Sequence, residues 1–154
     1  MQPKAPIVKQ KALVYITWDG SLLVFRQPHA PGAGIQVPGG TIKDNETPEQ
    51  GALREAVEET GLNGLVLVRF LGSQLHDHKP FGRNELHQRY FFRVRCTSMP
   101  PEAWRHYESD PSESPGEMPL FEFFWARLSG NLPDLIADHG YLLPQLVQDE
   151  SQAA

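Results

Sequence analysis

Three closely spaced glutamates are the residues of this chain best suited to do chemistry. Glu55, Glu58 and Glu59 follow one another at i, i+3 and i+4, so at about 100° per residue they share one arc of a helix. Like charges at this spacing repel each other by about 0.2–0.5 kcal/mol per pair. A hard divalent cation removes that repulsion, because Mg²⁺ takes oxygen ligands and commonly bridges carboxylates to substrate phosphates. The spacing alone also fits a solvated acidic helix face, so the surrounding residues must decide.

The helix that carries these glutamates has well-marked ends. Thr47 is suited to the N-cap, Pro48 to the first helical position, and Gln50 completes a capping box. Gly61 supplies the residue without a Cβ that helices favour just past their last turn. The sequence therefore predicts a helix from Pro48 to Thr60. Its buried stripe is predicted on the arc opposite the glutamates and side-chain-free Gly51, at Leu53, Ala56, Val57 and Thr60.

The stretch from Gly40 to Leu62 resembles the Nudix box at every fixed position. That pattern is Gly, five residues, Glu, seven residues, Arg-Glu, an aliphatic, any residue, Glu-Glu, any residue, Gly, an aliphatic. Here the positions are filled by Gly40, Glu46, Arg54, Glu55, Ala56, Glu58, Glu59, Gly61 and Leu62. The entry Val37-Pro38-Gly39-Gly40 is also similar, although Ile35 stands where many members carry Trp. Because so many fixed positions rarely coincide by chance, the chain is identified as a member of the Nudix family.

The resemblance implies a divalent-metal site on this helix. It makes Glu55 and Glu59 direct ligands and Glu58 a direct or water-mediated one, with a backbone carbonyl near Gly39 or Gly40 beside them. Mg²⁺ is the expected ion, and Mn²⁺ can substitute for it. Because family members differ in which glutamate is the general base, Glu58 and Glu55 both remain candidates.

Further residues are expected at the site. Glu46 and Arg54 are expected to form an ion pair that holds the loop against the helix; the alternative is two independent surface charges. Arg26 is expected to bind substrate together with Gly39 and Gly40.

The activity that the resemblance implies is hydrolysis of a nucleoside diphosphate linked to another group X, which gives a nucleoside monophosphate and phosphorylated X. An alternative is a Nudix-derived module that senses a nucleotide without cleaving it, against which the complete set of glutamates argues. A second alternative is an isomerase-like relative acting on a prenyl diphosphate, but no Cys lies near the box. The sequence does not identify the nucleobase of the substrate. Four aromatic residues fit either stacking on a base or simple packing: Trp18, Phe81, Trp104 and Tyr107.

Composition narrows the class of protein. The 154 residues predict a single domain over 1–154, and the net charge of −5 argues against a broad nucleic-acid or anionic-membrane surface. Cys96 is the only cysteine, so no internal disulfide forms. The first residues lack an apolar signal region, and no apolar run approaches the length of a membrane span. We expect a cytoplasmic protein that binds a small nucleotide or diphosphate, as a monomer or homodimer.

The remaining elements predict a layered α/β fold. A hairpin is expected around Asp19-Gly20, and helical segments are expected within Leu132 to Val147, interrupted at His139-Gly140. Strands are predicted at Ala12 to Thr17, Leu22 to Phe25, Ile35 to Val37, Leu65 to Leu71, Glu85 to Arg95 and Phe121 to Arg127. The resemblance makes the fold specific: a mixed β-sheet sandwiched between helices, with the box forming a loop-helix-loop.

Two segments are predicted to be irregular. His76-Asp77-His78 is expected to lie in a polar loop, and the proline-rich stretch from Met99 to Pro119 is expected to lack regular structure. Because many Nudix enzymes complete the metal site with a carboxylate from outside the box, we expect one acid of this second segment to reach it. The candidates are Glu108, Asp110, Glu113 and Glu117, with Glu117 or Glu113 preferred.

Overall fold

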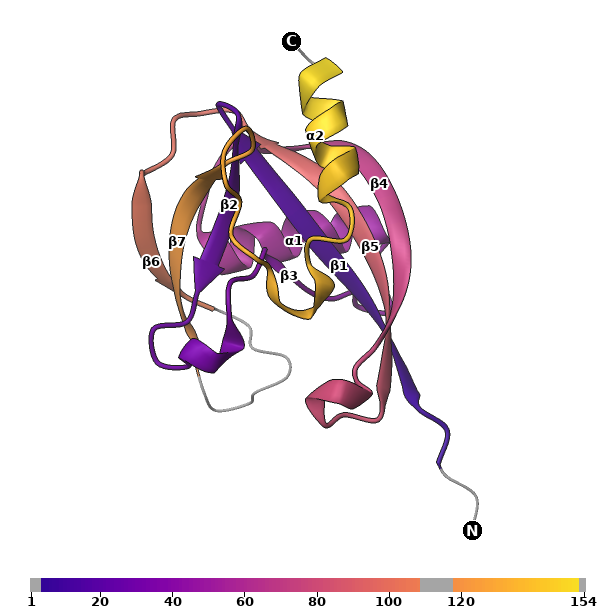
Figure 1. Cartoon of the computed structure of the whole chain (residues 1–154). Helices are drawn as coiled ribbons and strands as arrows, with labels where there is room; N and C mark the ends of the chain where they lie inside the picture. The colour runs from indigo at the N-terminus through magenta and orange to yellow at the C-terminus, as the bar shows by residue number, and fades with distance from the viewer. Residues whose placement is uncertain (1–3, 109–117, 153–154) are drawn as a thin grey trace.

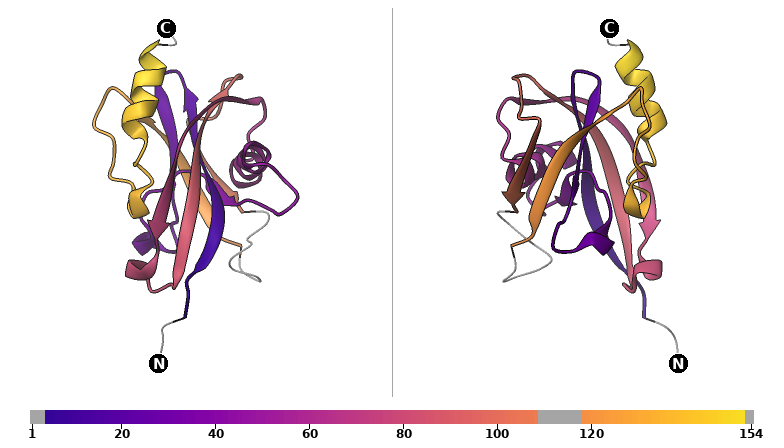
Figure 2. Two further views of the ribbon diagram at one scale, coloured as in Figure 1. Left: turned by 90° about the vertical axis from the view of Figure 1, so that its right-hand side faces the viewer. Right: turned by 60° about the vertical axis from the view of Figure 1, so that its left-hand side comes forward.

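The computed structural model describes residues 4–108 and 118–152, which form a seven-stranded mixed sheet with a helix on each face (Figure 1, Figure 2). The strands are β1 (Ile7–Trp18), β2 (Ser21–Arg26), β3 (Gly39–Thr41), β4 (Leu65–Asp77), β5 (Glu85–Cys96), β6 (Ala103–Tyr107) and β7 (Leu120–Arg127). The helices are α1 (Pro48–Thr60) and α2 (Leu143–Gln152), with 3₁₀ turns η1 (Pro31–Ala33), η2 (Lys79–Phe81) and η3 (Ile136–Asp138). Within these ranges no helix is long and apolar enough to cross a bilayer.

Strand β1 organises the sheet, whose order is β4-β5-β1-β2-β7-β6. It runs parallel to β5 over most of its length, while the other pairings are antiparallel. The segment Lys11 to Leu13 pairs with β3, whereas β2 pairs with β1 only beyond it, at Thr17 and Trp18. This split pairing places the Gly39-Gly40 dipeptide beside the middle of β1.

The predicted hairpin at Asp19-Gly20 is present. Both residues have positive φ, 47° for Asp19 and 72° for Gly20, as the tight turns that match strand twist require. The predicted strands that flank this turn correspond to parts of β1 and β2.

Two buried clusters lie on opposite faces of the sheet, because β1 alternates its side chains between them. One cluster packs β1, β5 and β7 beneath α1, through Ala52 and Ala56 of that helix. The other packs β1, β2 and β5 beneath the C-terminal segment, through Leu142 and Leu146. Figure 2 shows α1 and α2 on the two sides of the sheet. The predicted sandwich of a mixed sheet between helices is therefore confirmed.

Helix α1 has the predicted ends, since Thr47 and Gln50 form the capping box and Gly61 closes the helix with φ 72°. Its buried arc differs from the prediction. Ala56 and Thr60 are buried and Leu53 is half-buried, but Val57 is 48% exposed.

The helix instead buries the neighbouring arc, which carries Glu55 and Glu59. At about 100° per residue, the buried face is rotated by roughly 100° from the predicted stripe. Apolar periodicity could not reveal this rotation, because two of the buried positions are acidic.

Three other expectations on the fold are corrected. The region expected to be irregular contains strand β6, whose proline-rich and acidic flanks concealed its short alternating pattern. Strand β4 continues to Asp77, so His76 and Asp77 lie in a strand; two register shifts near Leu67 and Phe70 break its alternation. Residues Ile35 to Val37 form only isolated bridges, and the strand of that region is β3.

The orientation of α1 can be tested with two neighbouring substitutions. Ala56→Asp places a carboxylate at a position that is 0% exposed, so we expect it to lower the free energy of unfolding by several kcal/mol, on the order of 3–5. Val57→Asp at its 48% exposed position should stay within about 1 kcal/mol of the parent. Urea unfolding followed by circular dichroism measures both. Equal destabilisation by the two variants would show that the helix faces are misassigned.

Candidate functional site

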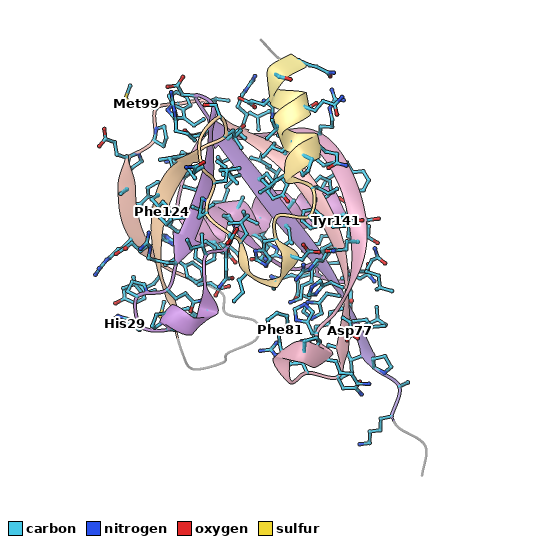
Figure 3. All side chains as sticks on the ribbon, viewed as in Figure 1. His29, Asp77, Phe81, Met99, Phe124 and Tyr141 are labelled. Carbon is cyan, nitrogen blue, oxygen red and sulfur yellow. The ribbon has the colours of Figure 1, made fainter. Side chains whose placement is uncertain are left out.

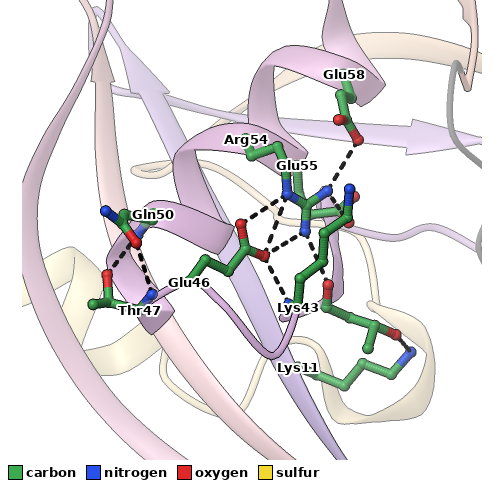
Figure 4. Close-up of polar contacts among 9 residues, drawn as sticks. Lys11, Lys43, Glu46, Thr47, Gln50, Arg54, Glu55 and Glu58 are labelled. Atoms are coloured by element: carbon green, nitrogen blue, oxygen red, sulfur yellow. Dashed lines mark hydrogen bonds and ion pairs between the residues drawn. The ribbon is translucent and has the colours of Figure 1, made fainter.

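Arg54 joins three parts of the site (Figure 4). Its Nη2 lies 2.7 Å from Glu46 Oε1 in the loop before α1, so the expected ion pair is present. Its Nη1 donates to Glu55 Oε1 at 2.9 Å and to Glu58 Oε2 at 3.1 Å. Nη2 also donates to the Thr41 carbonyl of β3 at 3.0 Å. One guanidinium thus fixes the loop, the helix and the short strand relative to one another.

Two glycines allow the backbone to approach the carboxylates of α1. The Gly39 N–H donates to Glu59 Oε2 at 3.1 Å. A Cβ on Gly40 would lie 2.3 Å from the carboxyl carbon of Glu55, and one on Gly39 would lie 2.4 Å from the carbonyl oxygen of Ala12. Any side chain at either position would therefore displace the backbone or the glutamate that it faces.

Glu55 and Glu59 are both buried, each with 4% exposure. Burial raises the pKa of Glu55 to about 7, although the Arg54 guanidinium opposes the shift. Burial, with the neighbouring charges of Glu55 and Glu108, raises the pKa of Glu59 well above its ordinary value; the Gly39 N–H acts in the opposite direction. Without a positive charge in addition to Arg54, burial therefore favours the protonated forms of both side chains.

A third carboxylate completes the cluster. Glu108 follows β6, and its carboxylate lies with those of Glu55 and Glu59 within 4.8 Å. It is one of the four acids considered in the sequence, although not one of the two preferred there. Glu117, Glu113 and Asp110 lie outside the described residues, so a ligand role for Glu117 stays a prediction. Glu58 lies outside this cluster.

The cluster fits a divalent cation. All its side-chain donors are carboxylate oxygens, which Mg²⁺ and similar hard ions prefer. The buried carboxylates repel one another, and the missing Cβ of Gly40 leaves the space that the Glu55 carboxylate occupies. A cation would thus stabilise the ionised forms that burial disfavours.

Two members of the cluster, Glu59 and Glu108, line a cleft of about 510 Å³ together with Gly39 and Gly40. This part of the cleft is here called its floor. One wall comes from β2 and the region of η1, the other from β5 and the region of η2, and residues of η3 also line the cleft. Figure 1 shows η1 and η2 on either side of η3.

Arg26 is placed differently from the other expected site residues. It lies at the end of β2, with its guanidinium 4.5 Å from the centre of the Phe124 ring and its Nε 3.8 Å from Glu122 Oε1. The cleft is lined by the neighbouring Phe25 and Gln27 instead. A role for Arg26 in substrate binding stays a prediction.

The aromatic residues considered for base stacking divide between the cleft and other environments. Phe81 lines the cleft and is labelled near the end of β4 in Figure 3. Trp104 stacks on Phe123 with ring centres 5.1 Å apart and donates to the Thr60 carbonyl, so it packs α1 against β6. Trp18 lines a separate pocket, and Tyr107 is exposed.

Sequence reasoning missed the basic residues of the cleft. His78, His87 and Arg89 line it, yet they lie in segments treated as an ordinary loop and strand. A signal was present, because His87 and Arg89 occupy alternate positions before buried Phe91 in one strand.

Comparison with known proteins gives a consistent result. A family model described as the NUDIX domain matches residues 9–146. A MutT NUDIX hydrolase from Burkholderia pseudomallei has a similar structure, with a TM-score of 0.65 and 22% identity over 90% of this chain and 98% of that one.

Two further solved structures are similar in fold. A UDP-X diphosphatase superposes with a TM-score of 0.63 and 17% identity, covering 97% of this chain and 66% of that one. An ADP-ribose pyrophosphatase from Streptococcus suis 89-1591 gives 0.61 and 16%, covering 92% and 91%. At such identities the likeness concerns the fold.

The burial of Glu55 predicts a pH-dependent difference between the parent and Glu55→Gln, both free of metal. Because the pKa of Glu55 is raised in the folded state, its protonation adds to the free energy of unfolding, fully so below pH 4.5. This contribution is lost as the pH rises through about 7. The neutral variant should therefore gain stability relative to the parent across this window, by up to about 3 kcal/mol. Urea unfolding in EDTA at a series of pH values measures the difference.

The comparison with the variant is necessary because two histidines, partly buried His78 and buried His139, change the free energy of unfolding with pH in the opposite direction. The pKa of His78 is lowered to about 4 and that of His139 to about 3, chiefly by burial, so both make stability rise with pH. Saturating Mg²⁺ should reverse the advantage of Glu55→Gln at pH 8. A difference between variant and parent that is constant with pH would contradict the burial of an ionisable Glu55.

Gly40→Ala tests the close approach to Glu55. The new Cβ would fall 2.3 Å from the Glu55 carboxyl carbon, so the glutamate must move away from the cluster. We expect at least about a tenfold weaker stabilisation constant for Mg²⁺, since a ligand at the wrong position loses about 1.4 kcal/mol or more. Thermal melts against Mg²⁺ concentration measure it. Gly130→Ala, whose Cβ would have no neighbour nearer than 3.6 Å, is the control and should match the parent.

Proposed function

This chain belongs to the Nudix family, a family of pyrophosphohydrolases that generally require a divalent cation, and we propose that it hydrolyses a nucleoside diphosphate linked to another group X with Mg²⁺ as cofactor. The products are a nucleoside monophosphate and phosphorylated X. Mn²⁺ can replace Mg²⁺ at an all-carboxylate site.

The carboxylate cluster on the floor of the cleft is the observation that carries this proposal. Hydrolysis requires water to reach a phosphorus atom that is surrounded by negatively charged oxygens. A bound divalent cation neutralises part of that charge and orients the diphosphate. Glu55, Glu59 and Glu108 would hold it: their carboxylates lie within 4.8 Å of one another, and Glu59 and Glu108 line the cleft in which a substrate would lie.

The other residues of the box position these carboxylates and move a proton. Arg54 orients Glu55 and Glu58 through Nη1, so that both carboxylates keep a set direction without a substrate. Glu58 is the more exposed of the two, at 25% against 5% for the side chain of Glu55. We therefore place the general base at Glu58, whose carboxylate would accept the proton of the attacking water. Glu55 remains the second candidate.

Two of the similar structures support the substrate class. The names UDP-X diphosphatase and ADP-ribose pyrophosphatase both describe enzymes that act on a nucleoside diphosphate bonded to a further group. The cleft, at about 510 Å³, is of the size that small-molecule sites commonly have. Incubation with a panel of such compounds and Mg²⁺, following release of the nucleoside monophosphate, tests the proposal. Binding without release for every compound would identify a sensing module instead.

Glu59→Gln is expected to abolish most of the hydrolysis. The amide keeps the size of the side chain and an oxygen for the Gly39 N–H, but it removes one negative charge from the cation site. We expect kcat to fall by about 10²-fold or more, as when an electrostatic group is lost from an active site. Exposed Glu49→Gln on the first turn of the same helix is the matched control and should retain activity. Unchanged turnover by Glu59→Gln at saturating Mg²⁺ would refute its role.

A further inference from the structure

One face of the sheet changes from apolar to basic along β1 and β5. Leu13 and Phe91 are register partners on the parallel strands and are buried beneath the C-terminal segment. Two residues earlier, and hence on the same face, Lys11 and Arg89 are register partners as well. His87 lies a further two residues back on β5. The sheet thus becomes basic where this face lines the cleft.

Arg89 is buried without a carboxylate at ion-pair distance among the described residues. It is 2% exposed. Its Nη1 donates to the Ala137 carbonyl at 2.6 Å and to Gln74 Oε1 at 3.4 Å, and its Nη2 lies 3.3 Å from His78 Nε2. All three partners are uncharged acceptors. Asp138 acts only at longer range, and its Oδ2 accepts a hydrogen bond from Gln74 Nε2 at 2.7 Å.

Arg93, another buried arginine of the same strand, is paired with carboxylates. It lies four residues after Arg89 on the same face and is also buried, with 5% exposure. There the guanidinium meets Asp149 at 2.6 Å and Glu150 at 2.5 Å, both from α2. Because a buried charge is costly unless it is paired, the missing carboxylate at Arg89 indicates that its anionic partner comes from outside the chain.

Further basic side chains surround Arg89. The rings of His78 and His87 stack with centres 3.6 Å apart. Arg83 also lines the cleft, and its backbone N–H donates to the His78 carbonyl at 3.2 Å. Glu85 lies 2.9 Å from His87 Nε2 and 4.0 Å from Arg83 Nη1.

Burial and repulsion between like charges disfavour the positively charged forms of these side chains. Burial, followed by the charges of His87 and Arg89, lowers the pKa of His78 to about 4. Burial lowers the pKa of Arg89 to about 10. A bound dianion would offset both effects, since it pairs with the guanidinium and favours protonated imidazole.

We infer that His78, Arg83, His87 and Arg89, here called the basic wall, bind a phosphate monoester of the substrate that is separate from the diphosphate being cleaved. Guanidinium and imidazole donors are suited to phosphate oxygens. The floor of the cleft, where a cation would hold the diphosphate, is instead formed by Gly39, Gly40, Glu59 and Glu108. The floor would therefore bind the diphosphate through a cation, whereas the basic wall would bind a phosphate monoester directly.

The inference rests on the proposed function and specifies its substrate class. Group X would be a phosphorylated group, such as a phosphosugar or a second nucleotide with its own phosphate, and not a neutral sugar. Phe81, whose ring centre lies 5.6 Å from that of His78, gives this end of the cleft an apolar side for the carbon skeleton of X.

The experiment uses the full-length chain in EDTA and follows the histidine ring signals by NMR. Ribose 5-phosphate and inorganic phosphate should both shift the signals of His78 and His87 with saturation, whereas ribose should not. The signal of His106, on β6, serves as an internal control. The inference is overturned if neither phosphate compound shifts the two histidines, or if ribose shifts them as strongly as ribose 5-phosphate does.

Substitutions then place the binding site. Arg89→Gln should weaken ribose 5-phosphate binding by about tenfold or more, as expected for loss of a charge-assisted hydrogen bond. The Arg83 side chain is 48% exposed, so Arg83→Gln is expected to fold. This variant keeps the test valid if Arg89→Gln does not fold. It should weaken binding by about threefold or more, since it removes one charge of the basic wall. Arg105→Gln, which removes a surface arginine paired with Glu122, is the matched control. Equal affinity in all folded variants would overturn the inference.

Glu59→Gln separates this inference from the proposed function. The variant should bind ribose 5-phosphate in EDTA as the parent does while losing hydrolysis. A parent that binds the phosphate but cleaves no compound of the panel would refute only the proposed hydrolysis. A parent that hydrolyses a substrate but shows no phosphate binding at the basic wall would refute only the inference.

Discussion

Burial of two carboxylates side by side is the constraint on which the rest of this structure depends. Glu55 and Glu59 are almost inaccessible to water, and burial raises the pKa of both. A fold selected for stability alone would place apolar residues there, since the desolvation of two adjacent carboxylates costs more than Arg54 and the Gly39 N–H offset. The arrangement would become favourable with a cation bound between these carboxylates and that of Glu108. Stability and function are therefore linked at α1.

The surrounding residues hold this costly arrangement in place. Arg54 ties the glutamates of the helix to the preceding loop and to β3. Gly39 donates its N–H to Glu59, and Gly40 leaves room for Glu55. The pairing of β3 with β1 positions both glycines, so the sheet topology directly sets the shape of the site.

Charge is segregated within the cleft. The floor is acidic and suited to a cation, whereas the end near η2 is basic and suited to an anion. These two ends arise from different strands of one sheet, because β1 pairs with β3 along one edge and with β5 along the other. A substrate that extends along the cleft would meet first one kind of charge and then the other. This geometry favours an elongated molecule with phosphate at more than one point.

The sequence by itself determined the helix with its capping box, the mixed sheet between helices, the family and the glutamates of the box, because these depend on local spacing and on residue types. Only the tertiary structure decided which arc of α1 is buried, since Glu55 and Glu59 carry no apolar signal. It also brought Glu108 to the cluster through β6, and it left buried Arg89 beside His78 and His87 without a carboxylate at ion-pair distance among the described residues. These contacts join residues far apart in the chain, and strand pairing, which no local pattern encodes, sets them.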